Sequence, residues 1–165
     1  MPEFVADFHI HSRYSRACSK NLSVKELAKW AKIKGIDVLG TGDFTPPLWL
    51  EELQATLRPT GRGLCAFDGT YFMLTAEANT LFYKRGKAHN IHHVLFAPSF
   101  EAVERINQEL AAFGSLSLDG RPLLRMEAWR LVEVILGVEP RALIVPAHAW
   151  TPHFAIFGSN SGFDS

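Results

Sequence analysis

The chain has 165 residues, is 47% hydrophobic, and balances 17 Lys and Arg residues against 17 Asp and Glu residues. This length suits one domain, the apolar content excludes a wholly disordered chain, and zero net charge excludes a polycationic nucleic-acid coat. No apolar run approaches the ~20 residues of a membrane-spanning helix, and the first residues lack the order of a secretory signal. We therefore expect a cytoplasmic protein that makes no use of a membrane.

Apolar periodicity and turn residues predict an alternation of strands and helices along the chain. Several helix boundaries are marked by capping residues, such as the Ser23 capping box and the following Gly35. The expected elements are a strand over 3–8, a helix between Ser23 and Gly35, a strand over 36–40, a helix over 48–57, a loop over 58–70, a strand over 71–78, a hairpin over 79–98, a helix between Ser99 and Gly114, a loop over 115–122, a helix over 126–136 that Gly137 ends, and a strand over 142–145.

This order indicates the α/β class with a largely parallel sheet, interrupted by one β-hairpin. A complete βα barrel takes about 250 residues, so a chain of this length provides only about five of its eight strand–helix units. In such barrels the residues that follow each strand meet on one face, which carries the active site.

Nearly every expected strand ends in a side chain that can bind a metal ion. His9 and His11 are two residues apart on a strand end, so both imidazoles point the same way. Glu77 lies in the otherwise apolar segment LTAEAN, where an unpaired carboxylate would be costly. Several candidates also have a simpler interpretation: polar strand ends for His9, His11 and Glu77, a helix cap or turn for Asp43, and a helix cap for His148. The candidates are His9, His11, Asp43, Glu77, His92 and His148.

A mixture of imidazole and carboxylate ligands suits Zn²⁺, Mn²⁺ or Fe²⁺ better than Ca²⁺ or Mg²⁺. This number of candidate ligands favours more than one ion, and paired ions are typical of enzymes that hydrolyse phosphoesters. Arg13 and Arg16 follow the first strand, where arginine could bind a phosphate bidentately or simply belong to a surface loop.

Five segments together resemble the PHP (polymerase and histidinol phosphatase) domain family, and within it the endonuclease Q group of DNA-repair enzymes. They are ADFHIHSRYSRACSKN, GTGDFT, LTAEAN, IHHVLFAP and PAHAWTPHFAIFGSNSGFDS. The resemblance implies a distorted, TIM-like βα barrel with a hairpin insertion. It implies a hydrolase that uses two or more divalent ions (Zn, Mn, Fe or Mg) to cleave DNA on the 5′ side of uracil, hypoxanthine, xanthine or abasic sites. A repair or replication protein is a further expected partner.

The resemblance also implies roles for individual residues. Asp43, His11 and Glu77 are expected to be catalytic, and Asp43 either binds metal or orients a ligand. The implied metal ligands are His9, His11, Asp43, Glu77, His92 and His148, and the implied substrate contacts are Ser12, Arg13, Tyr14 and Arg16.

The sequence departs from the family pattern at several places, among them Pro46 and His153, where the endonuclease Q group tends to have His and Trp. Phe44 stands where the common PHP motif has a histidine, and the chain contains no late Asp-x-His pair. We therefore expect residues 1–165 to form an incomplete PHP barrel, the N-terminal portion of a longer enzyme. Two alternatives stay open: a PHP phosphoesterase acting on a small phosphate monoester, and a non-catalytic module of a polymerase- or helicase-associated protein.

Overall fold

The computed structural model describes residues 3–163. None of the helices in this part of the chain has the length and apolar character needed to cross a membrane. The elements are β1 (Ala6–Asp7), α1 (Val24–Lys34), β2 (Val38–Gly40), α2 (Pro47–Thr56), β3 (Arg58–Pro59), β4 (Leu64–Phe67), β5 (Thr70–Lys84), β6 (Lys87–Ala97), α3 (Phe100–Leu110), β7 (Leu123–Leu124), α4 (Ala128–Val138) and β8 (Leu143–Pro146).

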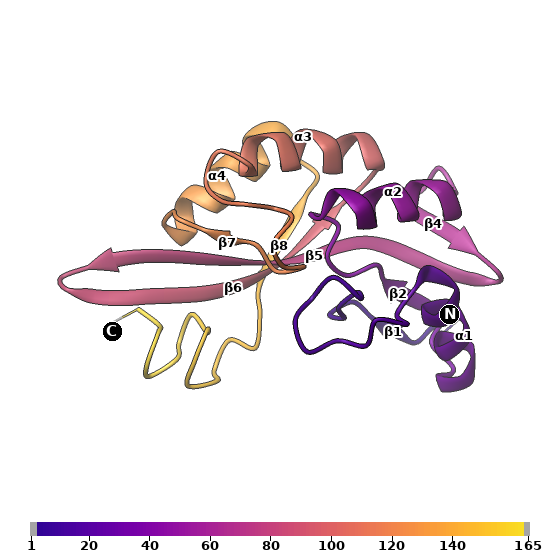
Figure 1. Ribbon diagram of the computed structural model, residues 1–165, viewed down its shortest axis with the longest axis horizontal. Helices are drawn as coiled ribbons and strands as arrows, with labels where there is room; N and C mark the ends of the chain where they lie inside the picture. Colours follow the sequence, from indigo (N-terminus) through magenta and orange to yellow (C-terminus); the bar gives the residue numbers. More distant parts are fainter. Residues whose placement is uncertain (1–2, 164–165) are drawn as a thin grey trace.

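Strand β5 organises the whole eight-stranded sheet. Its first part pairs with β2 on one edge and β4 on the other, and its second part pairs with β6 and β7. Figure 1 shows the long β5–β6 hairpin crossing the molecule, with α2, α3 and α4 on one side of it. Segments that are far apart in the sequence are thereby brought to the middle of β5.

The expected α/β class and hairpin are present, but the expectation of a largely parallel sheet is wrong. Three pairs are parallel (β1–β2, β2–β5 and β5–β7), whereas β3–β4, β4–β5, β5–β6 and β6–β8 are antiparallel. The hairpin accounts for two of the antiparallel pairs, because β6 runs against β5 and β8 pairs with β6. The other two pairs belong to β3 and β4. The described strands form an open sheet rather than a closed barrel.

Helix boundaries follow the capping signals in most cases. The Ser23 hydroxyl accepts a hydrogen bond from the Glu26 amide at the start of α1, and Gly35 ends that helix with a φ of 69°. Ser99 caps α3 in the same way through the Ala102 amide. The expected stops at Gly114 and Gly137 are wrong, since α3 ends at Leu110 and α4 continues to Val138, where Glu139 is its C-cap.

The loop expected over 58–70 is also wrong in part, because it contains β3 and β4. These short strands extend the sheet beyond β5, and their pairing depends on a neighbouring strand rather than on their own sequence. The main core lies between the sheet and its helices, and Trp49, Phe44 and Phe72 are fully buried in it. This core includes Leu39 of β2 and Phe72 of β5, so the packing supports the pairing of these two strands.

Candidate metal centre

The candidate centre is built from four separate segments of the chain. His9 and His11 come from the segment after β1, Glu77 from the middle of β5, His92 from β6, and His148 from the turn after β8. Parallel pairing aligns β1 and β2 with β5, and antiparallel pairing aligns β6 with it. Residues spread over most of the sequence therefore meet around one carboxylate.

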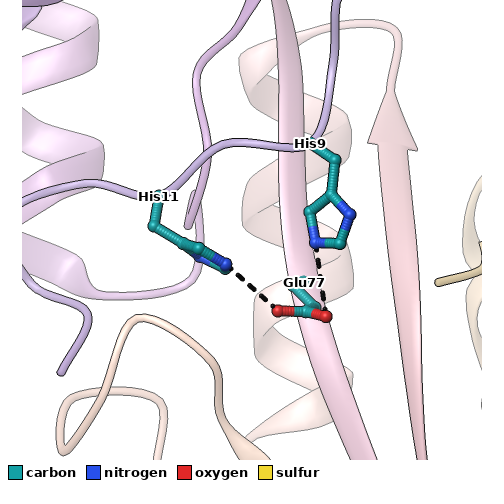
Figure 2. A group of neighbouring side chains, drawn as sticks. All are labelled: His9, His11 and Glu77. Carbon is teal, nitrogen blue, oxygen red and sulfur yellow. Dashed lines mark ion pairs between the residues drawn. The ribbon is translucent and has the colours of Figure 1, made fainter. Parts of the chain in front are cut away.

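The first group of possible ligands consists of His9, His11 and Glu77 (Figure 2). The Nε2 atom of His9 lies 3.3 Å from Oε1 of Glu77, and the Nε2 atom of His11 lies 3.3 Å from Oε2. The two imidazoles thus approach different oxygens of the same carboxylate, which is the arrangement that the His-x-His spacing predicts.

A second group shares Glu77 with the first and adds His92 and His148. The Nδ1 atom of His92 lies 2.8 Å from Oε1 of Glu77, and the Nε2 atom of His148 lies 3.2 Å from it. The His92 ring is stacked on Phe154, at a centroid distance of 4.7 Å. Glu77 is therefore the common member of two adjacent sets of ligands.

Four imidazole nitrogens surround the buried carboxylate of Glu77 and can stabilise its charge as hydrogen-bond donors. The Glu77 side chain is only 2% exposed. Burial alone raises the pKa of Glu77, but hydrogen bonds with His11, His9 and His92 more than reverse this and hold the pKa well below its usual range. Burial likewise lowers the pKa of His11, but bonds to Asp43 and Glu77 outweigh it and raise the pKa to about 9.

The donor set fits a transition-metal ion. Neutral imidazole and carboxylate groups are the ligands preferred by Zn²⁺, Mn²⁺ and Fe²⁺, and within each group the ligand atoms lie within 4.8 Å of one another. The shared carboxylate could serve two ions at once. His9, His11, Glu77, His92 and His148 are the residues that would hold them.

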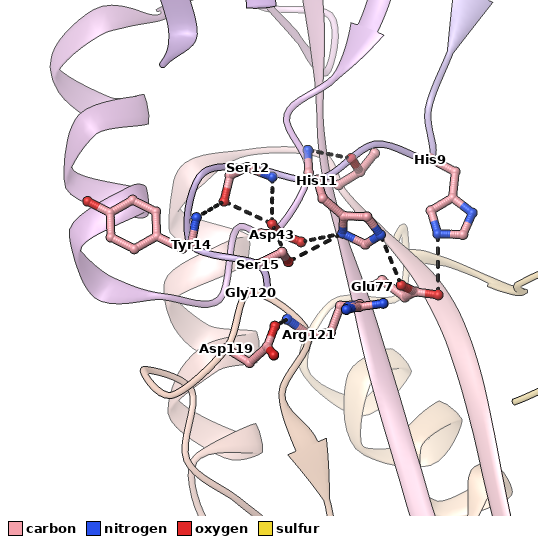
Figure 3. Close-up of polar contacts among 12 residues, drawn as sticks. His9, His11, Ser12, Tyr14, Ser15, Asp43, Glu77, Asp119, Gly120 and Arg121 are labelled. Atoms are coloured by element: carbon pink, nitrogen blue, oxygen red, sulfur yellow. Dashed lines mark hydrogen bonds and ion pairs between the residues drawn. The ribbon is translucent and has the colours of Figure 1, made fainter. Parts of the chain in front are cut away.

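Asp43 lies behind His11 rather than in either group of ligands (Figure 3). Its Oδ1 atom is 3.0 Å from Nδ1 of His11, while its Oδ2 atom accepts hydrogen bonds from the Ser12 amide, the Ser12 hydroxyl and the Ser15 hydroxyl. A carboxylate in this position fixes the ring orientation and leaves the opposite nitrogen available to a metal. The structure thus places Asp43 as an orienting partner of His11.

Gly120 packs directly against Asp43, a contact that the sequence around Gly120 does not predict. A Cβ atom at this position would lie 2.2 Å from the Ser15 hydroxyl and 2.4 Å from Oδ2 of Asp43. The backbone of Gly120 is held there because its amide donates to the Tyr14 carbonyl and its carbonyl accepts from the Thr45 hydroxyl. Only a residue without a side chain fits against the carboxylate.

The four expected substrate contacts lie near the centre, but most of their polar groups have partners within the protein. Ser12 is buried on Asp43, and the Tyr14 ring packs at a tilt against Trp49. The Arg13 guanidinium binds both carboxylate oxygens of Glu52, at 2.8 Å. Arg16 differs from the other three because its side chain is 84% exposed. Its Nε atom lies 3.4 Å from Oδ2 of Asp119.

The other histidines of the hairpin face away from Glu77, as strand alternation requires. His89 bonds to the Gly162 carbonyl and stacks on Phe82, and His93 bonds to the Thr80 hydroxyl. Burial and the neighbouring His92 lower the pKa of His93 to about 4, so it is a neutral core residue at pH 7.

The fold and the site together define an α/β protein with a His/Glu cluster, built around the buried Glu77, that is suited to metal ions. Among solved structures, the chain is similar to the lesion-specific endonuclease PfuEndoQ from Pyrococcus furiosus, with a TM-score of 0.82 and 33% identity over 93% of this chain. It is also similar to endonuclease Q in complex with a 27-mer duplex that has an abasic lesion at the active site, with a TM-score of 0.79 and 34% identity over 90% of this chain.

Among curated proteins, the chain is 31% identical over 147 residues to the uncharacterized protein MJ0043 of Methanocaldococcus jannaschii, an alignment covering 88% of this chain. A scan against protein-family models found no match. The chain spans 36% of the length of each endonuclease Q structure and 16% of the length of MJ0043. Its similarity therefore concerns one part of larger proteins.

Proposed function

We propose that this chain is the N-terminal, metal-binding portion of a DNA-repair endonuclease of the endonuclease Q type. The observation that carries the proposal is Glu77, a carboxylate shared by two groups of imidazole ligands in a fold similar to that of endonuclease Q. The substrate would be DNA with a deaminated base (uracil, hypoxanthine or xanthine) or an abasic site. The bond hydrolysed would be the phosphodiester on its 5′ side.

Metal ions at this centre would supply a hydroxide nucleophile near neutral pH and would neutralise charge on the phosphate. The chain's own residues prepare the centre. Asp43 holds the His11 ring through Nδ1, so that Nε2 faces Glu77, and the Ser12 and Ser15 hydroxyls hold Asp43 in turn. This chain of hydrogen bonds keeps the ligands in place before the ions and the substrate bind.

The wider architecture of the proposed enzyme is a PHP-type βα barrel that further strands complete. Within the described part of the chain, β8 pairs with β6 alone, and Leu143 and Val145 on it are 56% and 40% exposed. An unpaired edge with exposed apolar side chains is the kind of surface that additional strands cover. The similarity to about one third of each endonuclease Q chain supports the same arrangement.

The test uses the longest polypeptide that the reading frame encodes, with Mn²⁺ or Mg²⁺ and end-labelled duplexes. The duplexes contain uracil, hypoxanthine, an abasic site or no lesion, and E77Q protein is the control. Cleavage on the 5′ side of the lesion by the wild type alone is expected. Metal-dependent turnover of small phosphate monoesters without nicking would instead favour the phosphoesterase alternative. Absence of both bound metal and hydrolysis would favour a non-catalytic module.

A further inference from the structure

A cavity of about 930 Å³ opens beside the metal centre, between the β5–β6 hairpin and the segment over residues 111–125. Its volume is within the range of cavities that enclose a small organic ligand. The charged side chains that line it are Arg16, Arg121, Arg125 and Asp119. The chain as a whole has zero net charge, so this excess of arginine is a local feature.

The cavity lies on the same face of the hairpin as the metal ligands. Asn79 follows Glu77 by two residues on β5, so both side chains project from one face. Across the hairpin, Asn79 pairs with His92 and Leu81 pairs with Asn90, which puts Asn90 on this face as well. Asn79 and Asn90 both line the cavity, which therefore continues the surface of Glu77 and His92 along the hairpin.

The arginines are placed by the same contacts that build the metal centre. Arg121 follows Gly120, whose backbone is packed against Asp43, and Figure 3 shows its side chain extending toward the Glu77 side of the site. Arg16 belongs to the segment that also carries His9 and His11. Its Nε atom lies 3.4 Å from Oδ2 of Asp119, which lines the same cavity.

Several polar groups in the cavity lack a partner inside the protein. Within residues 3–163, no ion pair or hydrogen bond engages the guanidinium of Arg121 or of Arg125. The Oδ1 atoms of Asn79 and Asn90 are buried and accept no hydrogen bond in the same part of the chain. The unpaired guanidinium groups therefore favour a ligand that carries negative charge, and Asn79 and Asn90 add polar amide side chains to the same lining.

We infer that this cavity binds a nucleotide of the DNA strand next to the cleaved phosphodiester, with its phosphate on Arg121 and Arg125 and its polar edge on Asn79 and Asn90. Guanidinium groups match phosphate bidentately, and amide side chains match the donors and acceptors of a nucleobase. This inference rests on the proposed nuclease function and specifies where its substrate strand runs.

The test measures DNA binding without catalysis. A fluorescein-labelled duplex with one abasic-site analogue is titrated with the 165-residue chain in EDTA, by fluorescence anisotropy, over a series of salt concentrations. The R121Q/R125Q double variant should bind at least about tenfold more weakly. Its slope of log K against log salt should fall by about 1.5 to 2, because two phosphate contacts are lost. R62Q, which changes an exposed arginine outside the cavity, should bind like the wild type.

A second variant, N90D, changes almost no volume but puts a negative charge in the cavity, and it too should weaken binding. Thermal unfolding of each variant checks that the fold is kept. If the wild type binds DNA and both the double variant and N90D bind it equally well, the cavity assignment is wrong while the nuclease proposal stands. If the wild-type chain binds no DNA, the cavity assignment is overturned, and the cleavage assay with the longest polypeptide decides the nuclease proposal separately.

Discussion

His11 and Asp43 are joined on the side of the imidazole that faces away from the metal centre: Nδ1 lies 3.0 Å from Oδ1 of Asp43. The opposite nitrogen of the ring faces Glu77 at 3.3 Å. Since Asp43 is fully buried and held by Ser12 and Ser15, it cannot turn away from the ring without losing several hydrogen bonds. The orientation of His11 therefore depends on a residue that itself lies outside the ligand groups.

Replacing this carboxylate should weaken metal binding without removing a ligand. In D43N, the amide cannot stabilise the same ring orientation and charge, so we expect Zn²⁺ affinity to fall about 10- to 100-fold. Competition with a chromophoric chelator measures it. D68N, which alters an exposed carboxylate paired with Lys32, should leave the affinity unchanged. Equal affinities for D43N and the wild type would show that Asp43 does not orient His11.

The shared position of Glu77 predicts a particular pattern of metal content. Because Glu77 belongs to both ligand groups, E77Q should lose both ions, whereas H9A and H148A should each lose the ion of one group. Elemental analysis after gel filtration in Mn²⁺ gives the number of ions per chain. If E77Q retained the metal content of the wild type, the carboxylate would not be the shared ligand.

The sequence predicts the members of this site better than it predicts how they are supported. The His-x-His spacing and the carboxylate in an apolar strand are local signals, and the structure brings His9, His11 and Glu77 together. The part played by Gly120 is not local, because the atoms it packs against belong to Ser15 and Asp43, far away in the sequence. For the same reason, the short strands β3 and β4 have no local signal, whereas the capped helices α1 and α3 do.

Gly120 offers a direct test of that non-local packing. In G120A the new Cβ atom would overlap Ser15 and Asp43, so the loop or the carboxylate must move. We expect the free energy of unfolding to fall by about 1 to 3 kcal/mol, measured by urea denaturation. Metal affinity should fall as well, because Asp43 is displaced from His11.

The matched control is Gly137, which lies in helix α4 with no atom within 4 Å of an added Cβ. G137A should be neutral or should stabilise the chain by up to about 1 kcal/mol, since alanine favours helix more than glycine does. If G120A were as stable as G137A and kept its metal affinity, the close packing of Gly120 on Asp43 would have no consequence.

Glu139 gives a pH-dependent prediction far from the metal ligands. It caps the C-terminal end of α4, and its side chain is 3% exposed. Its oxygens accept hydrogen bonds from Arg141 Nε at 2.9 Å and from Arg105 Nη2 at 3.0 Å. The hydrogen bonds from Arg141, together with the charge of Arg105, hold the pKa of Glu139 below its usual range.

A carboxylate whose pKa is lower in the folded state binds fewer protons there than in the unfolded chain. Its contribution to stability is therefore complete at a pH above its pKa in the unfolded chain, about 4.3. That contribution is lost as the pH falls through its lower pKa in the folded state.

E139Q should be less stable than the wild type by about 1 to 2 kcal/mol at pH 7, because bonds to a charged acceptor are weakened. Urea denaturation at a series of pH values should show this difference shrinking below about pH 4. E133Q, which alters an exposed carboxylate on the same helix, should differ from the wild type by less than about 1 kcal/mol throughout. A deficit in E139Q that stayed constant down to pH 3 would mean that charge at this cap contributes nothing.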